Sequence, residues 1–140
     1  MGTTAALPTL KPMAAERNRN KYSRRLLLLE DDEQFESALR SFLEQQAYEV
    51  TSVRNGVDGV HEVLANEFDV IVCDILMPGL PGDMFYAAVQ RLRPHLCDKF
   101  VFISGLHGNP KINRFIQQVH GIMLAKPFRM ENLIEIISIM

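Results

Sequence analysis

Acidic, hydroxyl and ammonium side chains follow several of the apolar runs in this sequence. In chain order they are Glu30 and Asp31 within an acidic run, Asp74, Ser104 and Lys126. Carboxylates from different strands repel one another unless a hard cation lies between them. Their oxygens, completed by water, suit Mg²⁺, while a hydroxyl and a lysine ammonium opposite them would hold phosphoryl oxygens. These residue types predict a site that places a phosphoryl group on a carboxylate, which requires mainly positioning and charge neutralisation.

Short apolar runs that alternate with helical patterns must bring these residues together. Strands are predicted at residues 26–29, 49–53, 70–73, 100–103 and 122–125, and helices at 33–46, after Asn55-Gly56, at 85–92, at 112–119 and from Met130. Uninterrupted apolar runs are typical of strands buried on both faces. Five strand–helix units predict an α/β fold, a doubly wound five-stranded parallel sheet covered on both faces. Such sheets bind ligands beyond the carboxyl ends of their strands, where the acidic, hydroxyl and ammonium groups fall.

Helical spacing also predicts which side chains face the core. In the second helix these are Val57, Val60, Val63 and Leu64. In the first and third helices they are Phe35, Ala38, Leu39, Phe42, Leu43, Phe85, Ala88, Val89 and Leu92.

Length and composition favour one compact domain. The chain has 140 residues, of which 47% are hydrophobic and 23% charged, which excludes wholesale disorder. No apolar stretch approaches the roughly 20 residues of a membrane span, and none near the start resembles a signal-peptide core. Two cysteines do not make a disulfide framework. We expect a cytoplasmic protein in a reducing compartment, with no membrane insertion.

Charge is distributed unevenly along the chain. Residues 1–25 carry six Lys and Arg against Glu16 alone, a net charge of +5, whereas residues 26–140 carry nine against sixteen Asp and Glu, a net charge of −7. Residues 1–24 are predicted to form a flexible basic N-terminal segment or linker, either a solvated arm or a contact for nucleic acid or anionic lipid. The acidic remainder argues against direct nucleic-acid binding by the domain itself.

Four motifs, in register with the five strand–helix units, resemble the receiver domain of two-component response regulators. They are LLLLEDD (26–32), VIVCDILMPGLPG (70–82), FISG (102–105) and AKPF (125–128). The resemblance covers residues 25–140 and implies the (βα)5 flavodoxin-like receiver fold. The stretch from FISG to AKPF is more similar to receivers of hybrid histidine kinases than to those of transcription factors.

The resemblance implies a role for each candidate residue. Asp74 would be the phosphoacceptor, Glu30 and Asp31 the acidic pair that binds Mg²⁺, and the backbone carbonyl of Leu76 a further metal ligand. Ser104 and Lys126 would contact the phosphoryl group, and the Lys126–Pro127 bond would be cis. The donor would be a histidine kinase or a histidine phosphotransfer domain. The fourth helix, fifth strand and last helix would form the signalling face and a possible homodimer contact.

Several alternatives stay open at the level of sequence. Either Asp31 or Asp32 would serve as an N-cap for the first helix, so the acidic pair depends on register. An unphosphorylated pseudo-receiver that acts as a protein-interaction module is the alternative. Met123, three residues before Lys126 where many receivers carry Tyr or Phe, favours it, whereas the complete set of acidic residues, Asp74, Ser104 and Lys126 argues against it. We expect neither a receiver nor a pseudo-receiver to turn over a small-molecule substrate. A phosphoaccepting receiver would catalyse only its own phosphotransfer and autodephosphorylation.

Overall fold

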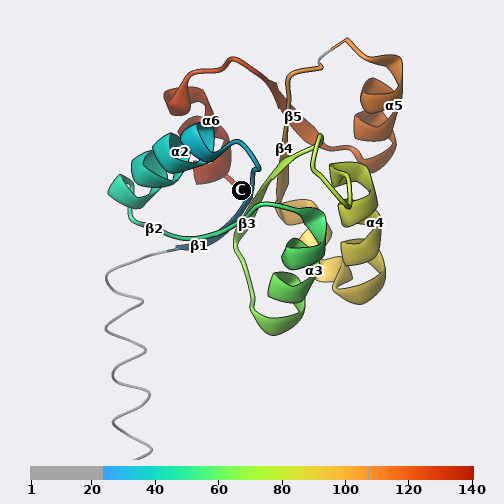
Figure 1. The fold of residues 1–140 in the computed structure, drawn as a ribbon, viewed down its shortest axis with the longest axis horizontal. Coiled ribbons are helices and arrows are strands. Elements are labelled where there is room, and N and C mark those ends of the chain that lie inside the picture. Colours follow the sequence, from blue (N-terminus) through green and yellow to red (C-terminus); the bar gives the residue numbers. More distant parts are fainter. Residues whose placement is uncertain (1–23, 107) are drawn as a thin grey trace, which may run out of the picture.

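Five parallel strands and five α-helices make up the fold in the computed structural model, which describes residues 24–106 and 108–140 (Figure 1). The strands are β1 (Arg24–Leu29), β2 (Tyr48–Val53), β3 (Val70–Asp74), β4 (Phe100–Ser104) and β5 (Ile122–Ala125). The helices are α2 (Glu33–Gln45), α3 (Gly56–Ala65), α4 (Gly82–Leu92), α5 (Pro110–Val119), α6 (Met130–Ser138) and the 3₁₀ helix η1 (Pro94–Lys99). The predicted α/β fold is confirmed. The predicted basic segment lies, up to residue 23, outside the described residues.

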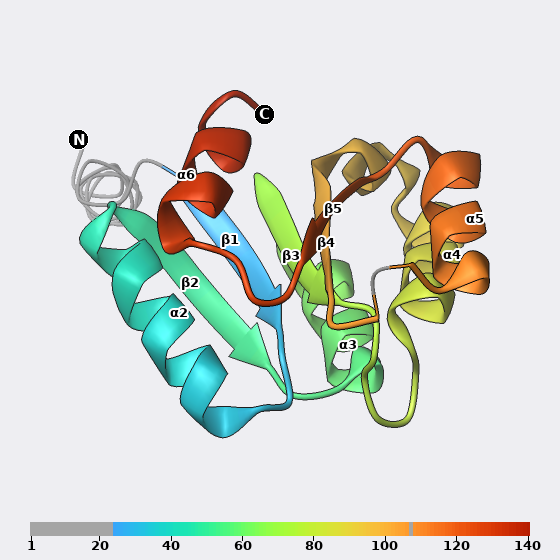
Figure 2. The same cartoon turned by 90° about the horizontal axis from the view of Figure 1, so that it is seen from above.

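The sheet has the strand order β2-β1-β3-β4-β5, with every pair parallel (Figure 2). From β1 the chain first moves to β2 at one edge, then returns to β3 on the other side of β1 and continues outward. The direction of winding therefore reverses between β1 and β3. The carboxyl ends of strands beside such a reversal diverge into a crevice where ligands bind.

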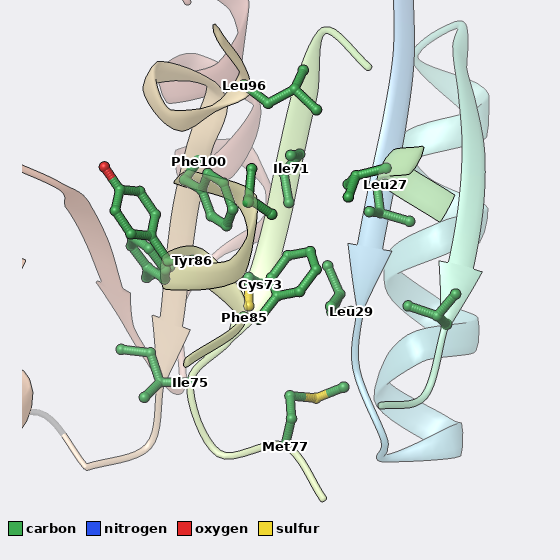
Figure 3. Close-up of a cluster of buried hydrophobic side chains, with 14 of the residues drawn as sticks. Leu27, Leu29, Ile71, Cys73, Ile75, Met77, Phe85, Tyr86, Leu96 and Phe100 are labelled. Atoms are coloured by element: carbon green, nitrogen blue, oxygen red, sulfur yellow. The ribbon is translucent and has the colours of Figure 1, made fainter. Parts of the chain in front are cut away.

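Two hydrophobic cores cover the two faces of the sheet. Because successive strand residues point to opposite faces, β1 divides its four leucines between them. Leu27 and Leu29 join the core under α3, α4 and α5, part of which is drawn in Figure 3. Leu26 and Leu28 join the core under α2 and α6. In the part of the chain that the structure describes, no helix has the length and apolar character needed to cross a membrane.

Helix α3 packs through only part of the apolar face predicted for it, since Val63 is buried and Val60 packs against the core as predicted, while Val57 and Leu64 do not. Val57 and Leu64 are 51% and 50% exposed, whereas Gly56 and Gly59 are buried. A Cβ on Gly59 would lie 2.6 Å from Leu29 Cδ2. The helix packs through Gly59 as well as Val63, because the missing side chain of Gly59 lets the helix backbone approach Leu29 of β1 closely. Apolar spacing alone cannot reveal such a contact.

The structure also differs from the prediction at several single positions. Ala38 and Leu92 were predicted inside, but both are exposed. Glu36 is buried instead on α2, where its carboxylate accepts a hydrogen bond from Arg40 Nε (2.7 Å). The 3₁₀ helix η1 was not predicted, because its six residues are too few for a helical period to be read.

Candidate functional site

Glu30 follows strand β1 and is buried at the β1–α2 junction. Its backbone N–H donates to Val53 O (3.0 Å), so the end of β2 fixes the main chain here. Its Oε2 accepts the Asp32 backbone N–H (3.0 Å). Asp32 is the N-cap of α2, since its Oδ1 accepts the Phe35 backbone N–H (3.1 Å). The capping role left open between Asp31 and Asp32 thus belongs to Asp32.

Asp74 ends the neighbouring strand β3 and is also buried. Its Oδ1 accepts the Leu76 backbone N–H (2.9 Å). Gly82, the first residue of α4, packs against the same stretch of backbone. A Cβ on Gly82 would lie 2.9 Å from Asp74 O and 2.7 Å from Ile75 Cα. The close packing of α4 against the end of β3 therefore fixes the main chain that carries Asp74.

Lys126 follows strand β5, and its ammonium joins the two buried carboxylates. Nζ donates to Asp74 Oδ2 (2.8 Å) and to Glu30 Oε1 (3.0 Å). The Lys126 backbone N–H donates to Ser104 O (2.9 Å), which extends the pairing of β5 with β4. The Lys126–Pro127 peptide is cis, as the resemblance implied. Residues that follow or end three different strands thus meet at the carboxyl ends of the strands.

Ser104 ends strand β4, which lies between β3 and β5, and it is fully buried. Its hydroxyl oxygen accepts the Leu106 backbone N–H (3.0 Å). Within residues 24–106 and 108–140, no hydrogen bond joins this hydroxyl to Asp74 or Lys126. The strand position brings Ser104 to the site edge, while its hydroxyl closes a local turn.

Burial and proximity set the electrostatics of the charged groups. Burial raises the pKa of Glu30, and the charge of Asp74 adds to the rise, while hydrogen bonds from the Asp32 N–H and Lys126 oppose it. Burial acts to lower the pKa of Lys126, but hydrogen bonds to Asp74 and Glu30 outweigh it, so that the pKa is raised overall. The lysine therefore stays charged and compensates the two carboxylates beside it.

The acidic cluster fits the cation that the residue types predicted. Glu30, Asp31 and Asp74 each offer a carboxylate oxygen, and these oxygens lie within 4.8 Å of one another. Glu30 and Asp74 are buried, whereas Asp31 is exposed. Mg²⁺ prefers oxygen ligands and retains several of its waters, so it requires a site that opens to solvent on one side. Two buried carboxylates and one exposed carboxylate meet both requirements.

Apolar side chains border this acidic cluster on the α4 and α5 side. Leu76 is 49% exposed and Leu106 is 44% exposed. Both line a groove of about 310 Å³, to which Met84 of α4 and Phe115 of α5 also contribute. The site is therefore polar at its base and apolar along this part of its rim.

Two phenylalanines near Lys126 had been assigned no part in the site by sequence reasoning. Lys126 Nζ lies over the Phe35 ring, 4.6 Å from its centroid. Phe128 packs edge-on against Phe35, with ring centroids 5.8 Å apart. Helical spacing placed Phe35 on the core face of its helix, and it does pack against that core. Its place in the first turn, directly after the acidic run, was the available signal for a second contact.

The sequence of this chain is similar to those of known signalling proteins. The transcription factor SKN7 of Candida albicans is 29% identical over 116 residues, which cover 81% of this chain and 20% of SKN7. The response regulator receiver protein CpdR of Brucella abortus is 29% identical over 114 residues, which cover 79% of this chain and 91% of CpdR. This chain spans less than half the length of several of the curated relatives that it matches.

A solved structure supports the fold independently. The receiver domain of sensor histidine kinase PA1611 from Pseudomonas aeruginosa, which holds a magnesium ion in its active-site cleft, matches with a TM-score of 0.73 at 22% identity. The match covers 82% of this chain and 94% of that one. The family model of the response regulator receiver domain matches residues 26–138. This chain therefore belongs to the response regulator receiver domain family of two-component signalling proteins.

Proposed function

We propose that this receiver domain takes a phosphoryl group from a phosphohistidine onto Asp74. The observation that carries the proposal is the bridge from Lys126 to both Asp74 and Glu30, with Asp31 in the same acidic cluster. Family membership supplies the class of reaction. The geometry supports the proposal, because it brings a buried carboxylate, an acidic cluster and a lysine ammonium together at the carboxyl ends of the strands.

The proposed transfer balances without any further reactant. A carboxylate oxygen of Asp74 bonds to phosphorus as the phosphorus–nitrogen bond of the donor breaks, and the electron pair of that bond leaves with the donor imidazole. Lys126 would exchange its hydrogen bond to Asp74 for one to a phosphoryl oxygen, where it acts as a point charge. Glu30, Asp31, Asp74 and the Leu76 carbonyl would hold Mg²⁺, which when bound supplies positive charge beside the phosphoryl oxygens.

Ser104 would convert the modification into a change of shape. Its hydroxyl would leave the Leu106 N–H and contact the phosphoryl group, which biases an existing equilibrium between two conformations. We place the readout on the face formed by α5, β5 and α6, where a homodimer or a downstream protein would bind. Met123, on β5 beside Phe102, would change rotamer in place of the aromatic residue common in receivers.

The partner in this proposal is a histidine kinase or a histidine phosphotransfer domain, and the receiver domain itself would be cytoplasmic. The domain would catalyse its own phosphorylation and dephosphorylation, with no turnover of a small molecule and no direct contact with nucleic acid. Residues 25–140 would form this unit, preceded by a basic segment. The alternative is a pseudo-receiver that binds its partner without phosphorylation, and Met123 is the residue that favours it.

Intact-mass measurement after incubation with acetyl phosphate and Mg²⁺ tests the proposal. We expect the wild-type protein to gain a labile mass of one phosphoryl group, about 80 Da, that chelation of Mg²⁺ prevents. Asp74→Asn should show no gain, whereas Asp83→Asn, which changes an exposed aspartate of α4, should match the wild type. A gain that persists in Asp74→Asn would assign the acceptor elsewhere. If neither acetyl phosphate nor a panel of phosphohistidine donors labels the wild type, the pseudo-receiver alternative replaces the proposal.

A further inference from the structure

The Lys126 ammonium has a third neighbour besides its two carboxylates. An ammonium group carries three N–H bonds, and two of them donate to Asp74 and Glu30. The face of the Phe35 ring lies on a further side, with its centroid 4.6 Å from Nζ. The lysine side chain is only 26% exposed. A ring face this close to a cation attracts it electrostatically, and it also keeps bulk water from competing for the ammonium.

Phe35 is held in this place by a closed circuit of contacts. Lys126 donates to Glu30 Oε1, and Glu30 Oε2 accepts the Asp32 N–H. Asp32 Oδ1 accepts the Phe35 N–H, and the Phe35 ring returns to Lys126. The N-cap bond that starts α2 thus positions the ring relative to the same carboxylate that binds the lysine.

A second aromatic ring joins the two segments from the other side. Phe128 lies two residues after Lys126 and meets the Phe35 ring at an interplanar angle of 88°. Both rings pack against the core under α2 and α6. Edge-to-face pairs of this kind add to the stability gained from buried area alone. The start of α2 and the loop after β5 are therefore connected through the rings as well as through the lysine.

We propose that Phe35 is a positioning residue for Lys126 and that its ring holds the ammonium beside Asp74, where the phosphoryl oxygens arrive. This inference rests on the proposed function. A positive charge that is already in place costs no reorganisation when charge develops on the transferring phosphoryl group. An aliphatic side chain of similar bulk would fill the same space without attracting the cation. The aromatic character of position 35, and not only its size, should then affect the rate.

Phe35→Leu and Phe35→Tyr separate ring from bulk in the full-length protein. We expect Phe35→Leu to lower the maximal rate of phosphorylation by acetyl phosphate at saturating Mg²⁺ about three- to tenfold, the range set by a partly desolvated cation–π contact. Phe35→Tyr should restore the rate to within about twofold of the wild type, because a tyrosine ring also attracts cations. Phe42→Leu, the same change on the same helix about 10 Å further along, is the matched control and should leave the rate unchanged.

Two further measurements distinguish positioning from a structural role. If Phe35 acts through Lys126, the loss caused by Phe35→Leu should disappear in a Lys126→Met background. In NMR spectra of the unphosphorylated protein, the Lys126 Hε protons should show an upfield ring-current shift that Phe35→Leu removes and Phe35→Tyr retains. The second readout requires no phosphotransfer.

Each outcome decides the inference. A wild-type protein with no upfield shift would show that the ring does not face the ammonium and would overturn it. An unchanged rate in Phe35→Leu, or an equal loss in the Lys126→Met background, would also overturn it. If the upfield shift is present but neither acetyl phosphate nor a phosphohistidine donor labels the wild type, the proposed function fails. The positioning role in phosphorylation then falls with it, and the ring–ammonium contact stands.

Discussion

Leu76 and Leu106 place apolar surface beside Asp74, and we expect them to hinder water there if Asp74 is phosphorylated as proposed. Both are about half exposed at the rim of the site, and the Leu76 backbone N–H already contacts the Asp74 carboxylate. Leu76→Asn would put a hydrogen-bonding group there to hold the attacking water. One hydrogen bond worth about 1 kcal/mol corresponds to roughly a fivefold change in rate. We therefore expect the half-life of the aspartyl phosphate, followed by intact mass after removal of the donor, to shorten about fivefold. An unchanged half-life would contradict a shielding role for Leu76.

Glu30 makes stability depend on pH in a direction that its surroundings fix. Burial raises its folded-state pKa above the unfolded value, so its contribution to stability is complete at pH below that unfolded value and is lost as pH rises through the folded pKa. The charged groups that face it are Asp74, Lys126 and Asp31. Glutamine does not ionise, so Glu30→Gln avoids the cost of a buried charge as pH rises. Its stability relative to the wild type should therefore increase from acid to neutral pH.

Urea unfolding of both proteins across this pH range, with a chelator present, measures the effect. Glu44→Gln, on the exposed side of α2, is the control and should give a difference that varies little with pH. A difference for Glu30→Gln that stays constant or decreases toward neutral pH would show that Lys126 fully compensates the buried charge.

At the scale of elements, the start of α2 divides two tasks between adjacent aspartates. Asp32 caps the helix, and Asp31 belongs to the acidic cluster. Asp32→Ala should lower the free energy of unfolding by about 0.5–2 kcal/mol, the usual cost of a lost N-cap, and leave Mg²⁺ affinity unchanged. Asp31→Ala should do the reverse, weakening Mg²⁺ binding by at least about tenfold, a loss seen even for groups outside the ligand shell. Urea unfolding and calorimetric titration of the two variants test this division, and matching effects in both would refute it.

The same junction shows how far sequence reasoning reached. Uninterrupted apolar runs were enough to predict β1, β3 and β4, because burial on both faces leaves a pattern that needs no tertiary detail. The edge strands β2 and β5 are only partly buried, and they were predicted from their places between helical patterns. The places of the acidic residues after strands predicted an acidic cluster, and the resemblance to receivers selected Glu30, Asp31 and Asp74. Two of the features that could not be predicted show why. Part of the buried face of α3 is formed by Gly56 and Gly59, which leave no apolar signal. The contact between Phe35 and Lys126 joins residues 91 positions apart, and only the folded chain brings them together.

At the scale of the whole molecule, the strand order gathers the charged residues of the candidate site at one place. The reversal of winding sets β1 beside β3, so the carboxylates that follow or end these strands become neighbours and leave a charge imbalance. Lys126 follows β5, the edge strand beyond β4, and its side chain reaches past the end of β4 to both carboxylates. Its positive charge offsets part of their negative charge. A fold wound in one direction only would have separated the acidic residues. The topology therefore accounts for both the location of the site and its need for cations.

The start of β1 contacts α6 and the residues after it, at the amino ends of the strands and away from the acidic cluster. Arg24, the first residue of β1, donates through its guanidinium to the carbonyl oxygens of Ile137 (2.5 Å) and Met140 (3.1 Å) near the end of α6. The Arg25 N–H donates to Asp69 Oδ2 (2.9 Å). A chain of residues 24–140 keeps all of these bonds and lacks only residues predicted to form a flexible segment, so we expect its free energy of unfolding to match that of the 140-residue chain to within about 0.5 kcal/mol.

A chain of residues 26–140 loses these three bonds and should be less stable by at least about 1.5 kcal/mol, the lower end of the range for a single hydrogen bond made by a charged group. Urea unfolding of the full-length protein and both shortened chains tests the two expectations together. The acidic cluster lies at the other end of the strands, so both shortened chains should also accept a phosphoryl group on Asp74 while folded. Equal stability of the two shortened chains would show that Arg24 does not hold the terminal helix. A loss already present in the 24–140 chain would place residues 1–23 within the folded unit.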